Sequence, residues 1–430
     1  MDEKIIKQKL LDNFLKYVNI PSQSNVNNEN VPSSEGQLVL AKKLYEELNS
    51  LGIEDVSLNT YGVVQAYIPS NIDNNEKFPS IGWVCHLDTV DVGLSEVVNP
   101  RIVKNYNGGD IILNREKDIK ISPLEDKNLL SYIGDDIVVT DGNSVLGADN
   151  KAAIANVMTA VSYIVENPNL KHGDIYLSFV PDEEIGLRGV RKIDYSKFDV
   201  DFAYTIDCCK LGELVYETFN AASGKLKIKG VSAHPMNSKN NLVNPIMIAH
   251  EFISMLDRSK MPENTEGREG YIWVTDIHSN VLDLSLDFNI RDHDRENFEK
   301  SKRYLVYITQ YLCKKYKKAK IEIEIEDVYR NIYDCIDDDN ALAIDKLKEA
   351  YALLGIEPEI IPMRGGTDGS YLSTRNILTP NYFTGALNFH SNKEYLPMNS
   401  FYKSFLVTLE LMIIKNWYNE YNSYNGMIYK

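Results

Sequence analysis

In the first half of the chain, some segments have hydrophobic residues spaced as in helices. Other segments are short apolar runs that predict strands. In residues 37–51, leucines and an alanine recur three and four positions apart, which predicts an amphipathic helix that ends at Gly52. Small residues open a further predicted helix over residues 151–165. Short apolar runs predict strands at residues 63–68, 80–89, 174–180 and 202–207. Strands that alternate with helices are typical of an α/β sheet, whose functional residues lie at the strand ends.

The pattern changes near residue 218, where polar and apolar residues begin to alternate. Residues 224–234 predict a half-exposed strand. The next segments predict in turn a helix, two strands, a helix and a strand, at residues 245–256, 271–277, 283–292, 294–315 and 320–328. The order β-α-β-β-α-β is typical of a small ferredoxin-like domain.

The α/β pattern returns after this segment, with helices predicted over residues 340–354 and 400–417. An inserted domain accounts for this order. We expect an α/β catalytic domain, with a central mixed β-sheet flanked by helices, formed by residues 1–217 and 331–430. Residues 218–330 are expected to form an inserted ferredoxin-like α+β domain.

Composition and charge argue against several classes of partner. The 430 residues include 46 basic and 62 acidic side chains, a formal net charge of −16. Nucleic acids and anionic membranes are bound by basic patches, so neither is expected as a partner. The chain has no uninterrupted apolar run of about 18 residues, and its charged start is unlike a signal peptide. We therefore expect a cytoplasmic protein with free thiols at Cys85, Cys208, Cys209, Cys313 and Cys335.

A run of acidic residues follows the apolar strand predicted at residues 174–180. Asp182, Glu183 and Glu184 are adjacent, and like charges this close repel one another. Such a run is most often a solvated loop. The alternative is that a bound cation stabilises the carboxylates, and the remaining candidate ligands decide between the two.

One pair of candidate ligands ends an apolar strand. His86 and Asp88 share one face of an extended segment, because side chains alternate along a strand. The carboxylate can therefore orient the imidazole, as groups behind a metal ligand do. A lone histidine would more often have only a structural role.

Further candidates are Asp149 before a helix, Asp207 at a strand end, and His390 in the segment GALNFHSNKEY. Taken singly, they are explained as a helix cap, a turn residue and a core or loop histidine. Together with His86 and Glu183–Glu184 they suit two zinc-like ions, each with about four ligands. No G-x-S-x-G motif is present, so a serine hydrolase is not expected.

The order of several motifs indicates a family resemblance. The motifs are HLDT, NPRIVKNYNGGDI, TDGNSVLGADNKA, PDEEIG, YTID, GELVYETFNAAS, SAHP, EGREGYIWV, RGGTDG and TGALNFHSNKEY. The chain resembles, over nearly its whole length, the peptidase T family of tripeptide aminopeptidases, within the di-zinc aminopeptidase/carboxypeptidase superfamily. HLDT or PDEEIG alone would indicate only the superfamily, whereas NPRIVKNYNGGDI and RGGTDG point to the peptidase T branch.

The resemblance implies two Zn²⁺ ions per chain. Asp149 matches the carboxylate that bridges both ions. His86 and Asp207 match the ligands of one ion. Glu184 and His390 match the ligands of the other. Relatives also carry a cis peptide bond directly after the bridging aspartate.

Other residues match the catalytic groups of the family. Glu183 matches the general base, which takes a proton from a bridging water and delivers it to the leaving amine. Asp88 matches the acid that orients His86. The inserted domain is implied to be a lid and dimer surface, and its His234 matches an oxyanion-stabilising histidine supplied by the partner subunit. The implied substrate contacts are Arg291, Arg364 and Asn388.

The sequence departs from the family pattern close to the predicted site. Cys208 and Cys209 follow Asp207 where the family typically has two glycines, and Met236 stands where it usually has one. The segment around His390 also differs. Lost glycines can change how closely the backbone approaches, but every matched ligand is retained, which favours an active enzyme.

The leading hypothesis is a homodimeric di-zinc metallo-aminopeptidase of peptide catabolism that removes the N-terminal residue from short peptides, tripeptides by resemblance. One alternative is another amide hydrolase of the superfamily, such as a dipeptidase, a carboxypeptidase or an N-deacylase. A second alternative is a non-catalytic paralogue that binds a peptide or a metal. The retained Glu183 argues against the latter, because binding needs no base.

Overall fold

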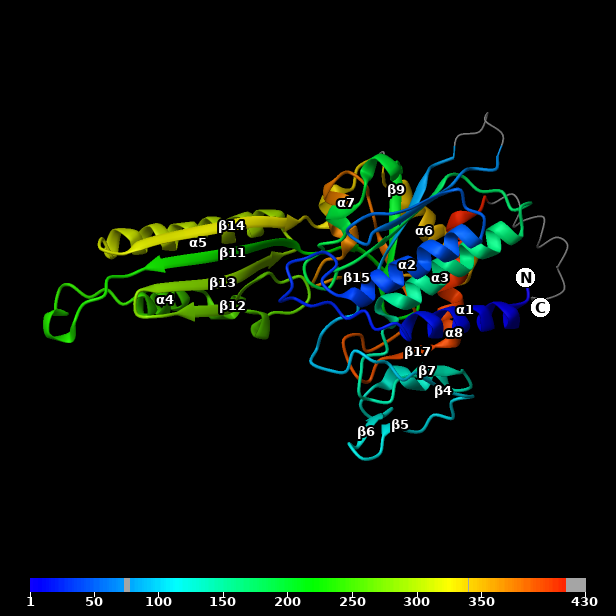
Figure 1. The fold of residues 1–430 in the computed structure, drawn as a ribbon, viewed down its shortest axis with the longest axis horizontal. Coiled ribbons are helices and arrows are strands. Elements are labelled where there is room, and N and C mark those ends of the chain that lie inside the picture. Colours follow the sequence, from blue (N-terminus) through cyan, green and yellow to red (C-terminus); the bar gives the residue numbers. More distant parts are fainter. Residues whose placement is uncertain (73–77, 339, 415–430) are drawn as a thin grey trace. The chain divides into compact units, whose positions relative to one another are not determined.

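The structure is a computed structural model that describes residues 1–72, 78–338 and 340–414. The chain divides into two compact units (Figure 1). Unit 1 consists of Met1–Tyr216, Asp337–Ile361 and Thr367–Lys430, and unit 2 of Glu217–Ile336 and Pro362–Gly366. The sequence pattern did not indicate that the short segment Pro362–Gly366 belongs to unit 2.

Unit 1 is built on an eight-stranded mixed sheet, as the predicted fold class requires. In spatial order its strands are β1 (Asp55–Leu58), β2 (Val64–Ile68), β8 (Ile175–Val180), β3 (Ile81–His86), β9 (Phe202–Cys208), β16 (Asn381–Phe383), β10 (Glu213–Glu217) and β15 (Glu359–Pro362). β8, β3, β9 and β16 form parallel pairs, whereas the pairs β1–β2, β2–β8 and β10–β16 are antiparallel. Every residue of β3 is buried, which explains its continuous apolar sequence.

The helices of unit 1 are α1 (Glu3–Val18), α2 (Glu35–Ser50), α3 (Ala148–Glu166), α6 (Leu342–Leu353), α7 (Asp368–Thr374) and α8 (Met398–Met412). α3 packs against β3 and β9 and also against α1 and α8. Ala152, Ala153 and Ala155 are buried in this contact. The last predicted helix, residues 400–417, ends at Met412 because Ile413 is extended, and residues 415–417 lie outside the described ranges.

Unit 1 also contains short strands that the sequence pattern did not predict. β17 (Tyr395–Pro397), β7 (Ile137–Val139) and β4 (Arg101–Val103) form a three-stranded antiparallel sheet, and β5 (Ile111–Asn114) pairs with β6 (Ile119–Ile121). Strands of three or four residues are too short to display a clear alternation. Their apolar residues share a small core with Leu387 and Tyr395, which flank the loop that carries His390.

Unit 2 has the predicted β-α-β-β-α-β order. Its elements are β11 (Asn220–Lys229), α4 (Pro245–Ser254), β12 (Tyr271–Ser279), β13 (Asp283–Asp292), α5 (Arg295–Lys315) and β14 (Lys320–Tyr329). The strands form an antiparallel sheet in the order β12-β13-β11-β14. Alternate strand residues such as Leu226 and Leu286 share a core with Phe252 of α4 and Leu305 of α5. The predicted strand 224–234 ends at Lys229, so His234 lies in the loop that follows.

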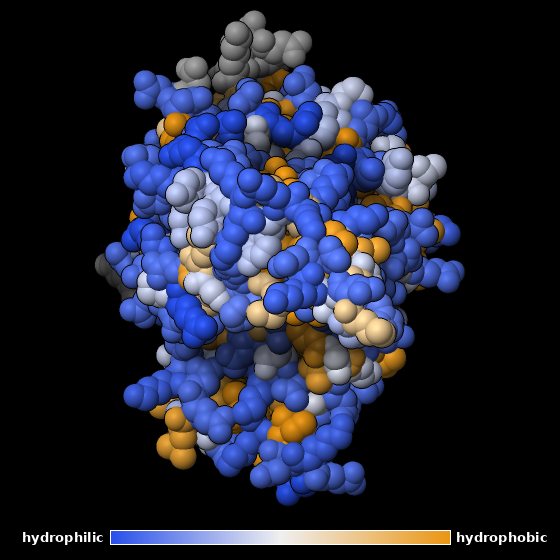
Figure 2. All heavy atoms as spheres, turned by 90° about the vertical axis from the view of Figure 1, so that its left-hand side faces the viewer, coloured by the Kyte–Doolittle hydropathy of each residue, from blue (hydrophilic) through white to orange (hydrophobic). Residues whose placement is uncertain are grey.

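The surface shows no large apolar region on the face drawn in Figure 2, which is mainly hydrophilic with apolar residues in small groups. Within the described ranges, no helix is long and apolar enough to cross a membrane. All five cysteines are free, as the sequence analysis expects.

Candidate metal centre

Three neighbouring parallel strands end close to one another in unit 1. β3 ends at His86, β8 at Val180 just before the acidic run, and β9 at Cys208 just after Asp207. Because the carboxyl ends of parallel neighbours lie at the same edge of a sheet, these residues meet there. The N-terminus of α3, with Asp149, packs against β3 and β9 and reaches the same edge.

Two imidazoles converge on the carboxylate of Asp149. Nε2 of His86 lies 2.9 Å from Oδ1 of Asp149, and Nε2 of His390 lies 3.1 Å from Oδ2. Nε2 of His390 also lies 2.9 Å from Oε1 of Glu184. The possible ligand atoms of His86, Asp149 and Glu184 all lie within 4.8 Å of one another. Imidazole nitrogens and carboxylate oxygens are ligands that zinc prefers.

The same cluster concentrates buried negative charge. Burial raises the pKa of Glu183 well above its usual range, and the charge of Asp207 raises it further. Burial likewise raises the pKa of Asp207, together with the charge of Asp149. Burial would also raise the pKa of Asp149, but hydrogen bonds from His390 and His86 hold it below its usual range. A divalent cation would offset this repulsion, so the donor set fits a metal centre.

Asp88 holds both His86 and the acidic turn in place. Its fully buried carboxylate accepts hydrogen bonds from the amides of Glu183 (3.0 Å) and Glu184 (3.1 Å). Nδ1 of His86 lies 3.1 Å from the carbonyl oxygen of Asp88 and 3.4 Å from its Oδ1. One buried acid therefore fixes the imidazole and the backbone of two acidic residues.

Asp182, the first of the three adjacent acids, has a separate structural role. It is fully buried with φ 56°, and its carboxylate accepts hydrogen bonds from the amide (2.8 Å) and hydroxyl (2.5 Å) of Ser33. The side-chain amide of Gln37 donates a further bond of 2.7 Å. Glu183 is 9% exposed and the Glu184 side chain 8%. The explanation of this run as a solvated loop is therefore wrong.

The residue after Asp149 links the ends of two strands. The Asp149–Asn150 peptide bond is cis, which confirms the expectation from the family resemblance. The side-chain oxygen of Asn150 accepts a hydrogen bond from the amide of His86 (3.3 Å), and its nitrogen donates to the carbonyl of Ile206 (2.7 Å). These bonds tie β3, β9 and the start of α3 together.

The side chain of His390 approaches Asp149 from a loop with left-handed residues. Asn388 has φ 59° and His390 has φ 58°. The side-chain nitrogen of Asn388 lies 3.3 Å from Oδ2 of Asp126 and 3.3 Å from the carbonyl of Lys393. These bonds shape the loop, and the substrate contact expected of Asn388 stays a prediction.

Three other expected site residues, His234, Arg291 and Arg364, lie in unit 2. His234 is exposed, and its Nδ1 accepts a hydrogen bond from the amide of Met236 (3.3 Å). Arg291 donates to the carbonyl oxygens of Ala222 (3.0 Å) and Ile290 (2.9 Å). Their roles towards substrate stay predictions.

Arg364 supports a loop within unit 2. Its guanidinium donates to the carbonyl oxygens of Gly267 (3.0 Å) and Glu269 (2.9 Å) and to the hydroxyl of Thr265 (2.7 Å). It also lies over the ring of Phe219, 5.3 Å from the centroid. These contacts explain why the segment Pro362–Gly366 belongs to unit 2, whereas the substrate contact expected of Arg364 stays a prediction.

The departures from the family's glycines cause no left-handed backbone. Cys208, Cys209 and Met236 do not occur among the residues with positive φ in the described chain. Cys208 is buried and its carbonyl accepts the amide of Thr384 (2.8 Å), whereas Met236 is 86% exposed. The larger side chains are therefore accommodated without a conformation that requires glycine.

The sequence analysis assigned no role to two buried acids beside the cluster, Asp368 and Glu394. Glu394 accepts hydrogen bonds from the amides of residues 146–149 and is 1% exposed. In the sequence, Glu394 is a glutamate four residues after His390, and no pattern marks it as buried.

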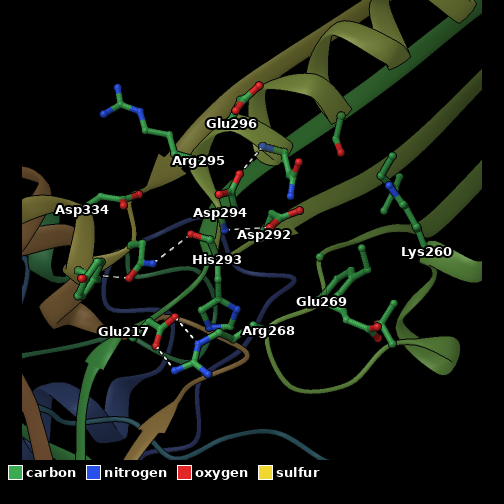
Figure 3. Close-up of a pocket in the computed structure, with 18 of the residues that line it drawn as sticks. Glu217, Lys260, Arg268, Glu269, Asp292, His293, Asp294, Arg295, Glu296 and Asp334 are labelled. Atoms are coloured by element: carbon green, nitrogen blue, oxygen red, sulfur yellow. Dashed lines mark hydrogen bonds and ion pairs between the residues drawn. The ribbon is translucent and has the colours of Figure 1, made fainter.

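Unit 2 contains a cavity of about 970 Å³ whose walls carry charges of both signs (Figure 3). Arg268 donates from Nε (2.7 Å) and Nη2 (2.6 Å) to the two carboxylate oxygens of Glu217. His293 also borders the cavity, but both of its ring nitrogens are buried. None of the residues grouped around Asp149 lines this cavity. Its size is therefore no reason to regard this cavity as the reaction site.

Comparisons with known proteins agree with the motifs. Residues 146–413 match the model described as "Peptidase family M20/M25/M40". A peptidase T-like protein of Yersinia pestis is 47% identical over 94% of this chain and 97% of its own length. A peptidase T of Geobacillus sp. (strain WCH70) is 43% identical over 95% and 98%. A crystal structure of a tripeptidase from Staphylococcus aureus subsp. aureus Mu50 has the same fold, with TM-score 0.72 and 23% identity over 94% and 97%.

Proposed function

Because this chain belongs to the M20/M25/M40 family of peptidases, alongside the peptidase T proteins, we propose that it is a di-zinc aminopeptidase that removes the N-terminal residue from tripeptides. The observation that supports this proposal most directly is the convergence of His86, His390 and Glu184 on the carboxylate of Asp149. Such a cluster of acids and imidazoles, buried except at His390, is suited to cations rather than to a neutral ligand.

The proposed ligand assignment follows from the positions of the donor atoms. Asp149 offers one carboxylate oxygen to the side of His86 and the other to the side of His390. It is therefore the residue suited to bridge two ions. His86 would hold the first ion with Asp207, whose carboxylate shares the buried charge of the cluster. His390 would hold the second with Glu184.

The proposed reaction is hydrolysis of the first peptide bond. Zinc ions, when bound, supply positive charge that lowers the pKa of a water molecule and polarises the substrate carbonyl. Glu183 takes the proton from that water and delivers it to the leaving amine. Asp88 keeps the amide of Glu183 and the ring of His86 in fixed positions during this transfer.

The test of this function compares three tripeptides of one sequence: free, N-acetylated and C-amidated. With zinc-loaded protein and mass spectrometry, we expect loss of the first residue from the free peptide and no cleavage of the acetylated one. Release of the last residue would indicate a carboxypeptidase, and release of acetate a deacylase. No product from any peptide would favour a non-catalytic paralogue.

Unit 2 is proposed to be the lid and dimer surface of a cytoplasmic homodimer, with His234 acting on the partner's substrate. β12 and β14 are the edges of its sheet, and most residues of β12 are exposed. Exposed edges tend to be paired or covered. Pairing two copies about a two-fold axis would cover an edge of each and bring each His234 towards the other subunit's site.

A mixture of two inactive variants tests the role of His234. His234→Ala and Glu183→Ala should each lose most of kcat while they retain zinc. If His234 acts in the partner's site, a mixed dimer has one site with both defects and one with neither, so activity should return on mixing. A mixture that stays inactive, with subunit exchange shown by native mass spectrometry, would contradict this role.

A further inference from the structure

The start of α3 is held by a side chain from a distant part of the sequence. Oε2 of Glu394 accepts hydrogen bonds from the amides of Leu146 (2.7 Å) and Gly147 (2.9 Å). Oε1 accepts from the amides of Ala148 (2.9 Å) and Asp149 (3.3 Å). Four consecutive amides therefore point at one buried carboxylate.

These four bonds hold a segment that is not yet regular helix, because Asp149 (φ −80°, ψ 99°) and Asn150 (φ −121°, ψ 18°) have non-helical backbone angles. The first amides of a helix have no partner within the helix and usually bond to a side chain at the N-cap. The N-cap of α3 is Gly147, with φ 73° and ψ 25°, and it makes no side-chain cap. Glu394, from a distant part of the sequence, satisfies the amides of residues 146–149 instead.

Glu394 and His390 belong to the same short loop. The loop is closed by two backbone hydrogen bonds, from Leu387 to Tyr395 (2.9 Å) and from Tyr395 to Leu387 (3.1 Å). The loop therefore contacts Asp149 twice, through His390 at the carboxylate and through Glu394 at the amide. A shift of the loop would move both contacts together.

We propose that Glu394 is a positioning residue for the metal centre: it holds the backbone of residues 146–149 so that the carboxylate of Asp149 stays between His86 and His390. This inference rests on the proposed metal function of that cluster. Within the described residues, the hydrogen bonds to Glu394 all come from backbone amides, so it acts through Asp149. Its loss should therefore weaken metal binding more than it weakens the fold.

The decisive variant is Glu394→Gln. Glutamine keeps the size of the side chain but turns an NH₂ group, which only donates, towards amides that also donate. We expect zinc affinity to fall by about 10–100-fold, as is usual when a residue that orients a metal ligand is lost. The affinity is measured on the full chain by competition with a chromophoric chelator. In the metal-free variant, amide hydrogen exchange should become faster at residues 146–149.

Val161→Ala is the matched control for a purely structural effect. Val161 is fully buried in the second half of α3, away from Glu394. It should lower the thermal unfolding temperature and leave zinc affinity within about 3-fold of the wild type, because cavity formation costs stability without moving a ligand. A loss of affinity in Val161→Ala as large as that in Glu394→Gln would overturn the inference.

The remaining outcomes also decide between the alternatives. Wild-type protein that binds zinc, together with a Glu394→Gln variant of equal affinity, would overturn the role of Glu394 alone. Wild-type protein that binds no zinc would overturn the metal centre as well. If Glu394→Gln fails to fold, amide hydrogen exchange in the metal-free wild type decides. Slow exchange at residues 146–149 supports the positioning role of Glu394. Exchange as fast as in exposed loops contradicts it.

Discussion

Replacement of Glu183 by glutamine should leave both zinc ions bound and lower kcat by about 10²–10⁴-fold, the usual contribution of a general acid–base group. Glutamine has the same size but neither accepts nor delivers a proton at neutral pH. The amide of residue 183 would still bond to Asp88, so the turn should keep its shape. Steady-state kinetics on a free tripeptide, together with the zinc content of the same sample, measure both parts.

The same exchange at exposed Glu54 provides the control for this variant and should leave kcat unchanged. If Glu183→Gln retains activity within a few-fold of the wild type, another group moves the proton. If it loses zinc, Glu183 is a ligand, and the division of roles between Glu183 and Glu184 is wrong.

Replacement of Asp149 by asparagine should have the largest effect on metal binding. Only one of the two side-chain atoms of asparagine accepts, whereas both oxygens of Asp149 lie against an imidazole nitrogen. Loss of a residue that hydrogen-bonds to a metal ligand lowers affinity by about 10–100-fold. Loss of the bridging ligand itself should lower zinc affinity by more than this. Activity at limiting zinc should fall by at least the same factor.

Chelator competition and kinetics at several zinc concentrations measure this effect. Asp12→Asn, on the exposed side of α1, is the control and should behave as the wild type. An Asp149→Asn variant that binds two zinc ions with unchanged affinity would show that the ions are held elsewhere.

The strands β2, β8, β3 and β9 and the elements of unit 2 were predictable because buried residues produce a clear apolar pattern, whereas β1, β16, β10 and β15 of the central sheet were not predicted. β3 and β8 lie inside the sheet with neighbours on both sides, so their residues read as continuous apolar runs that end at His86 and before Asp182. In unit 2, one face of each strand meets the core, and the residues of β13 alternate accordingly. The strands of the small sheet around β7 contain three residues each and show no such pattern.

The grouping of acids and imidazoles around Asp149 was predictable in part because several of these residues end strands or begin a helix, whereas their role as metal ligands stays a prediction. The separate roles of Glu183 and Glu184 came from the family resemblance, since adjacent glutamates have the same chemistry. The structural roles of Asp182 and Glu394 were missed because their partners, Ser33 and the amides of residues 146–149, lie far away in the sequence. Backbone amides leave no trace in the residue pattern, so a carboxylate that binds them resembles a surface charge.

Anomalous X-ray scattering at the zinc absorption edge, from crystals of the zinc-loaded protein, tests the central claim most directly. Two peaks per chain are expected, one between Asp149 and His86 and the other between Asp149 and His390, with Asp149 contacting both. A single peak, or two peaks that do not share Asp149, would contradict the proposed di-zinc centre.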